Sequence, residues 1–124
     1  MSSPTPRPPS PRGLRIALIF ALAAHRLHAH YEYGKWLTDA QAAQLAADWL
    51  TRQKLTLTQD ERRHLASLAD TLARQISQTL SREAGLFTAH EMMESLDPRH
   101  HSEIAETLMV ECERLFDSEP FSHD

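Results

Sequence analysis

The chain is poor in glycine and cysteine, and each shortage excludes a kind of site. Its 124 residues include three glycines and one cysteine. Three scattered glycines cannot form a glycine-rich loop that cradles phosphates, and a lone cysteine forms neither an internal disulfide nor a cysteine-based metal site. Cys112 also lies between two glutamates, whose negative charges raise the pKa of a thiol. We expect Cys112 to be a half-buried, unreactive thiol on the last helix.

Strand patterns and long apolar runs are also lacking. The longest strand candidate is the connector 55–57, and the longest apolar run, residues 16–24, ends at His25 and Arg26. A membrane-spanning helix needs about 20 apolar residues, so no membrane span is expected. The length fits one domain of common size. What remains is the all-α fold class.

Helix starts, by contrast, are marked repeatedly. Thr38, Thr58 and Thr88 are each followed three residues later by Gln or Glu and then by an apolar periodic run. In such a capping box the Thr hydroxyl accepts from the third helical amide, and the Gln or Glu side chain accepts from the cap amide. Asp97-Pro98 carries a different start signal, an acidic N-cap followed by proline at the first helical position.

These signals, combined with apolar periodicity, predict five helices over residues 14–33, 39–53, 59–84, 89–96 and 98–117. Within 39–53, for example, Ala42, Leu45, Ala46 and Trp49 recur at the spacing of one helix face. Gly85 is expected to close the third helix. The prediction is a small all-α bundle of four to five helices, whose short connections favour antiparallel neighbours.

Both ends of the chain differ from this bundle in composition. Residues 1–13 hold five of the seven prolines, a density that excludes helix and sheet. We expect residues 1–13 to be a disordered Pro/Arg tail, 14–117 a single helical-bundle domain, and 118–124 a flexible acidic tail.

The first helix is apolar on all sides, which allows three interpretations. It is a central core helix, an interface that two copies bury as a symmetric dimer if the monomer leaves it uncovered, or a signal segment. In the third interpretation three arginines form the basic region, cleavage occurs near Ala23, and the protein is secreted or periplasmic. We favour the central core helix in a cytoplasmic protein.

Charge is distributed unevenly along the chain. Residues 1–35 carry five basic residues against one acidic residue, whereas residues 83–124 carry eleven acidic residues against two arginines. The asymmetry indicates either contact between the two ends or a basic partner for the acidic end.

The acidic end and nearby apolar pairs favour a protein–protein interaction module. Such a module would act without catalysis or a cofactor, as an adaptor, an inhibitor, a chaperone or a small subunit of a larger assembly. The acidic face expected to meet a basic surface of another protein consists of Glu103, Glu106, Glu111 and Glu113. The apolar anchors, in which methionine suits adaptable contacts, are Leu86, Phe87, Met92 and Met93.

Metal binding is an alternative function. His25, His28 and Glu32 recur at i, i+3 and i+7, which places them within a narrow arc of one helix face. Imidazoles and a carboxylate in that arrangement suit zinc or a similar divalent ion. His90 and Glu94 could complete the ligand set, although no HExxH motif is present.

A DNA- or nucleoprotein-associated regulator is a further alternative, with direct nucleic-acid binding disfavoured. The net charge is −4, and the arginines of the third predicted helix are interleaved with uncharged residues. No turn residue interrupts the apolar stripe from Leu65 to Leu80, so a helix-turn-helix motif is not indicated there.

Overall fold

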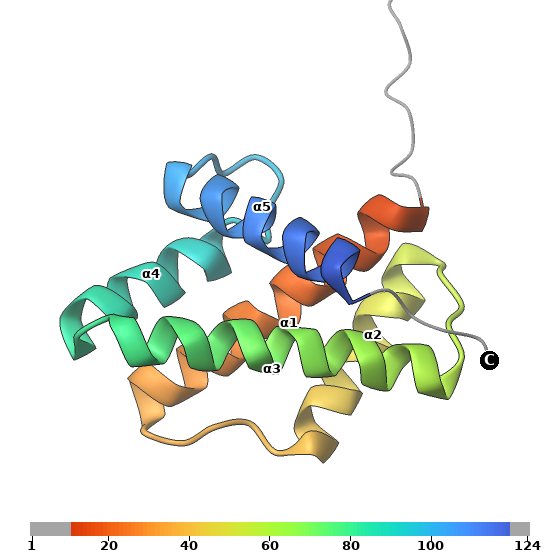
Figure 1. Ribbon diagram of the computed structural model, residues 1–124, viewed down its shortest axis with the longest axis horizontal. Helices are drawn as coiled ribbons and strands as arrows, with labels where there is room; N and C mark the ends of the chain where they lie inside the picture. Colours follow the sequence, from red (N-terminus) through yellow and green to blue (C-terminus); the bar gives the residue numbers. More distant parts are fainter. Residues whose placement is uncertain (1–10, 120–124) are drawn as a thin grey trace, which may run out of the picture.

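The computed structural model describes residues 11–119, and the regular structure in this range is entirely helical. Coloured from red to blue in Figure 1, the helices are α1 (Pro11–Tyr33), α2 (Asp39–Gln53), α3 (Gln59–Thr79), α4 (Arg82–Glu94) and α5 (Glu103–Ser118). The predicted all-α bundle is confirmed. Of the predicted tails, residues 1–10 and 120–124 lie outside the described residues. Residues 11–13 instead open α1, because proline is tolerated in the first helical turn, and Ser118 is the last residue of α5.

α1 lies at the centre and packs against each of the other four helices (Figure 1). Its buried residues include Leu18, Leu22 and Leu27, each at most 1% exposed. Fully burying a leucine side chain contributes about 1.5–3 kcal/mol, so the core is built around this helix. The first helix is therefore the central core helix.

The structure bears differently on the dimer and the signal-segment interpretations of the first helix. The dimer required an uncovered first helix, and α1 is covered within a single chain. Cleavage near Ala23 would remove residues 16–23, most of which are buried, so the fold described here belongs to the uncleaved chain. In none of these five helices do length and apolarity together reach what a bilayer crossing requires.

The Thr38 capping box at the start of α2 is present in full. The Gln41 amide donates to Thr38 Oγ1 at 3.1 Å, and the Thr38 amide donates to Gln41 Oε1 at 3.0 Å. At the other end, Lys54 adopts a left-handed conformation with φ of 55° and closes the helix. Local sequence therefore sets both ends of α2.

The Thr58 box forms only its first half. Thr58 Oγ1 accepts from the Glu61 amide at 3.1 Å, but the Glu61 carboxylate accepts from Arg15 Nε at 2.6 Å instead of turning back to the cap. Both side chains of this ion pair are largely buried. A contact between α1 and α3 thus replaces the local one.

The predicted long helix 59–84 is wrong, because it is divided between α3 and α4. α3 ends at Thr79, Leu80 is extended, and the Ser81 hydroxyl accepts from the Ala84 amide at 3.3 Å as the N-cap of α4. Thr88, predicted to start a helix, lies inside α4, where it is buried and its hydroxyl donates to the Ala84 carbonyl. Gly85, predicted to end a helix, also lies inside α4.

Packing explains why a glycine occupies the interior of α4. Gly85 is buried against the Tyr31 ring of α1, and a Cβ atom at this position would overlap three atoms of that side chain. The Tyr31 hydroxyl donates to the Leu80 carbonyl at 3.4 Å. The glycine therefore permits close crossing of α1 and α4 and does not terminate a helix.

The predicted start of the last helix at Asp97-Pro98 is also wrong. The Asp97 carboxylate accepts from the Arg99 amide at 2.9 Å and from the Arg99 side chain, which forms a turn. α5 begins at Glu103, where the Ser102 hydroxyl accepts from the Ala105 amide at 3.3 Å. Here the Asp97-Pro98 pair is part of a turn and does not start a helix.

Gly85→Ala tests the close crossing of α1 and α4. We expect the free energy of unfolding to fall by about 1–3 kcal/mol, because overpacking against Tyr31 outweighs the better helix propensity of alanine. Denaturant unfolding followed by circular dichroism measures the loss. In a Tyr31→Leu background the loss should disappear, and an equal loss in both backgrounds would contradict the close approach.

Candidate partner-binding surface and histidine cluster

One face of α5 presents carboxylates around an apolar residue. This acidic stripe consists of Glu103, Glu106, Val110, Glu113 and Asp117, all of them exposed, with Val110 at 63%. At about 100° per residue they fall within an arc of about 80°. The two glutamates of the first turn also complement the helix dipole, so the stripe does not oppose the formation of α5.

Glu111, predicted to belong to the acidic face, lies elsewhere on α5. It is half-buried and accepts from Arg114 Nε at 3.0 Å and from the terminal nitrogen Nη2 at 2.8 Å. Glu103, Glu106 and Glu113 therefore share the stripe, and Glu111 does not.

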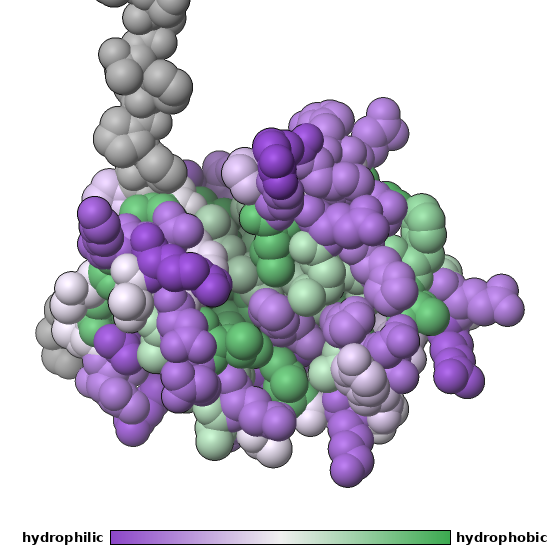
Figure 2. Space-filling model, turned by 180° about the vertical axis from the view of Figure 1, so that it is seen from behind, coloured by the Kyte–Doolittle hydropathy of each residue, from purple (hydrophilic) through white to green (hydrophobic). Residues whose placement is uncertain are grey.

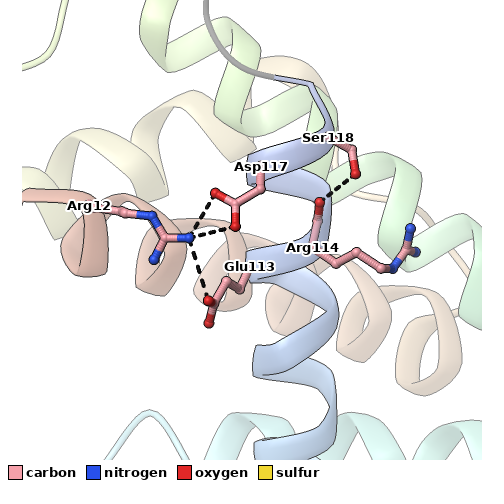
Figure 3. Close-up of polar contacts among 5 residues, drawn as sticks. All are labelled: Arg12, Glu113, Arg114, Asp117 and Ser118. Carbon is pink, nitrogen blue, oxygen red and sulfur yellow. Dashed lines mark hydrogen bonds and ion pairs between the residues drawn. The ribbon is translucent and has the colours of Figure 1, made fainter.

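Arg12 joins the start of α1 to the end of the acidic stripe, as Figure 3 shows. Its Nη2 atom lies 2.6 Å and 2.7 Å from the two carboxylate oxygens of Asp117 and 3.5 Å from Glu113 Oε1. The guanidinium also lies 5.8 Å from the centre of the Phe116 ring. The hydrogen bond with Asp117 is the main reason that the pKa of Arg12 is raised. Contact between the basic and acidic ends of the chain, one of the two predicted outcomes, is therefore present.

The amino-terminal half of the stripe is less occupied. Among residues 11–119, the Glu103 carboxylate has no ion-pair partner, and Glu106 Oε1 lies 3.4 Å from His101 Nε2. This half can offer negative charge to another molecule.

The four predicted apolar anchors on α4 separate into three environments. Phe87 is 58% exposed, Leu86 and Met93 are half-buried against the core, and Met92 is fully buried. Met92 is therefore a core residue and cannot contact a partner, a correction to the predicted surface. Val110 and Tyr33 were missed, because sequence spacing does not show which apolar residues the packing of the helices leaves exposed.

The predicted histidine cluster is realised in part. His28 and Glu32 of α1 meet His90 of α4, and one ligand atom from each residue lies within 4.8 Å of the other two. Glu32 Oε2 and His90 Nε2 are 3.3 Å apart, close to the separation of about 3.3 Å between two ligands of a tetrahedral zinc ion. These donors are chemically suited to zinc.

His25 does not join this cluster. It faces a groove of about 320 Å³ beside Trp49 and Arg52 of α2. Burial lowers its pKa, and the nearby positive charges of His28 and Arg52 lower it further.

Seen from behind, the face opposite α3 and α5 carries a band of apolar side chains bordered by polar ones (Figure 2).

Glu94, predicted to complete the ligand set, lies in a second cluster with Glu91 and His100. The Nε2 atom of His100 is 3.5 Å from a Glu94 oxygen and 3.6 Å from a Glu91 oxygen. His90 and Glu94 therefore serve different groups, although both are on α4.

Cys112 is fully buried, not half-buried as predicted. Burial, together with the negative charge of Glu111, raises its pKa to about 12. The thiol is a core group that is poorly suited to nucleophilic chemistry.

No protein-family model, curated protein or solved structure matches this chain. The acidic stripe and the histidine cluster, and not a relative, are therefore the basis for inferring a function.

The native protein should be nearly inert toward thiol reagents at mildly alkaline pH. Raising the pKa of Cys112 to about 12 lowers its thiolate population by roughly a thousandfold, and burial also blocks access. Reaction with a chromogenic disulfide reagent should be rapid only after denaturant is added. A native rate equal to that of the unfolded chain would contradict this description of the thiol.

Proposed function

We propose that the protein is a non-enzymatic module that binds another protein through the acidic stripe of α5. The observation that carries the proposal is the shared exposed arc of four carboxylates around Val110. The complementary partner presents Lys or Arg side chains around a shallow apolar site that receives Val110.

The charge pattern suits fast, salt-sensitive association. Arg12 already compensates Glu113 and Asp117, so Glu103 and Glu106 carry most of the charge available to a partner. Exposed charges of this kind steer diffusional encounter and are screened by salt. Because α5 packs against α1, α3 and α4 through buried residues such as Cys112 and Leu115, the stripe is held on a packed helix and does not have to fold on binding.

The partner class follows from the same chemistry. A rigid acidic helix suits an adaptor, an inhibitor or a small subunit that occupies a basic surface, including one that otherwise holds nucleic acid. Phe87 of α4 is exposed, and Leu86 and Met93 of the same helix are half-buried, so α4 offers a separate apolar contact. The proposal takes the chain to be uncleaved and cytoplasmic, since cleavage near Ala23 would remove much of the core.

Metal binding is a second candidate function, favoured by the His28–Glu32–His90 cluster. Two imidazoles and one carboxylate from α1 and α4 form a three-donor set that leaves one position of a tetrahedral zinc ion for water or another ligand. A metal held there would cross-link two helices that already pack closely.

The double variant Glu103→Lys/Glu106→Lys tests the acidic stripe. After capture of the partner from native lysate treated with nuclease, association kinetics are measured for each variant by surface plasmon resonance. The association rate constant should fall by about tenfold at low salt, and its salt dependence should become flatter, because the steering charge is reversed.

Asp60→Lys/Glu83→Lys is the matched control. It reverses the same number of exposed carboxylates, again in the first turns of helices, but on α3 and α4 instead of α5. Its association kinetics should match those of the unmodified protein. Equal kinetics for all three proteins would remove the stripe from the proposal, and an equal decrease in both variants would assign the effect to net charge alone.

Zinc should raise the melting temperature of the protein through the histidine cluster. We expect His90→Ala to abolish the rise and His101→Ala to preserve it, because His101 lies outside the cluster. Differential scanning fluorimetry with and without zinc, on protein without a His tag, measures the shift. A shift that survives His90→Ala but is lost in His25→Ala would favour the ligand set predicted from sequence.

A further inference from the structure

A pocket of about 680 Å³ lies between α2 and α3, with one side chain reaching it from α1. Its walls are built mainly from alanines of α2 and from Ala66 and Ser67 of α3, so its sides are small and close to the backbone. The charged residues that line it are four arginines and two aspartates: Arg26, Arg62, Arg63, Arg74, Asp39 and Asp70. We call it the arginine pocket.

Arg26 is the unusual member of this set, because it is a cation only 5% exposed in the middle of the core helix. One terminal nitrogen, Nη1, donates to Asp70 Oδ1 at 3.3 Å. Its Nε atom is buried and has no acceptor among residues 11–119. A buried charged donor without an acceptor is costly, and such groups are otherwise satisfied by ligands or water.

Arg62 supplies a second buried donor of the same kind. Its side chain is half-buried, and its Nε atom also has no acceptor among the described residues. Two guanidinium groups with incomplete hydrogen bonding, one from α1 and one from α3, therefore line the same pocket.

The Arg74 side chain lines the pocket and is held in place by contacts with Asp70 and Trp36. Its Nε atom donates to both oxygens of Asp70 at 3.1 Å and 3.0 Å, and its guanidinium lies 4.8 Å from the centre of the Trp36 ring. The Trp36 ring in turn stacks on His30 at 4.1 Å. This part of the pocket needs little reordering when a ligand enters.

The charge of the pocket is opposite to that of the whole chain. Four arginines against two aspartates leave an excess of two positive charges, whereas the chain carries −4. Asp39 and Gln59, which line the pocket, are the first residues of α2 and α3, so the positive ends of two helix dipoles also lie nearby. This field favours a dianion.

We propose that the arginine pocket binds a small dianionic ligand, a phosphomonoester or a dicarboxylate, whose oxygens accept from the guanidinium groups of Arg26 and Arg62. Guanidinium groups suit both anions, because their planar donors match carboxylate and phosphate oxygens. The volume lies within the range of about 300–1,000 Å³ typical of small-molecule sites, and the alanine walls leave space for a compact apolar part. This site is independent of the acidic stripe.

The test follows the arginine Nε–H signals of the full chain by NMR during titration with inorganic phosphate and, separately, with succinate. Sodium chloride at matched ionic strength is the reference. The signals of Arg26 and Arg62 should shift saturably with at least one of the two dianions, in the millimolar range because each probe fills only part of the pocket. Saturation by phosphate alone assigns the phosphomonoester class, and saturation by succinate alone assigns the dicarboxylate class.

Arg62→Gln and Arg82→Gln form the variant pair. Arg82 is exposed at the start of α4 and lies outside the pocket, so its substitution removes the same charge without touching the site. Arg62→Gln should weaken binding by about tenfold or more through loss of a charged hydrogen bond, and Arg82→Gln should leave binding unchanged. Arg62 is at the pocket wall and only half-buried, so the variant should keep the helical circular dichroism spectrum of the unmodified protein.

Two results would overturn the site. The first is that neither dianion shifts the Arg26 and Arg62 signals beyond the chloride reference. The second is that Arg62→Gln and Arg82→Gln weaken binding equally, which would show attraction by overall charge. Neither result would bear on the acidic stripe, whose own test uses α5 variants and a protein partner.

Discussion

Burial of α1 by the other four helices is the constraint on which the rest of the structure depends. Because α1 contacts all of them, each remaining helix has one face committed to α1 and one face left for solvent or a partner. The close crossing at Gly85 shows how strict this packing is, since the ring of Tyr31 occupies the space of a side chain. The acidic stripe lies on the outward face of α5, the histidine cluster lies where α1 meets α4, and the arginine pocket lies between α2 and α3.

Arginines distributed along α1 connect this central helix to its neighbours. Arg12 binds Asp117 of α5, Arg15 binds Glu61 of α3, and Arg26 binds Asp70 of α3. Exposed pairs such as the first contribute little stability, so their main effect is on orientation. Of these arginines only Arg12 reaches the acidic last third of the chain, which leaves Glu103 and Glu106 with charge that a partner can use. The internal pairing and the proposed external binding are thus two parts of one charge pattern.

Sequence reasoning succeeded where a local rule acts without competition. The Thr38 box formed as predicted because Gln41 has no stronger partner, whereas Glu61 left the Thr58 box for Arg15, a residue 46 positions away. Thr88 and Gly85 look like helix boundaries to a local rule, yet both are buried inside α4, where tertiary packing selects small side chains. For the candidate sites, the acidic face was predicted with Glu111 in it and without Asp117. The burial of Met92 was not predicted, because nothing local distinguishes it from Met93.

The sequence by itself determined that this protein is an all-helical bundle with an apolar central helix and an acidic last helix, because helix periodicity and capping depend on residues within a few positions of one another. Only the tertiary structure decided which groups from different helices meet. It brought His90 to His28 and Glu32 in place of His25, and it placed Arg26 beside arginines of α3 around one pocket. Such meetings depend on the rotation and crossing of packed helices, which arise from the fit of side chains across the whole core and leave no signal in local spacing.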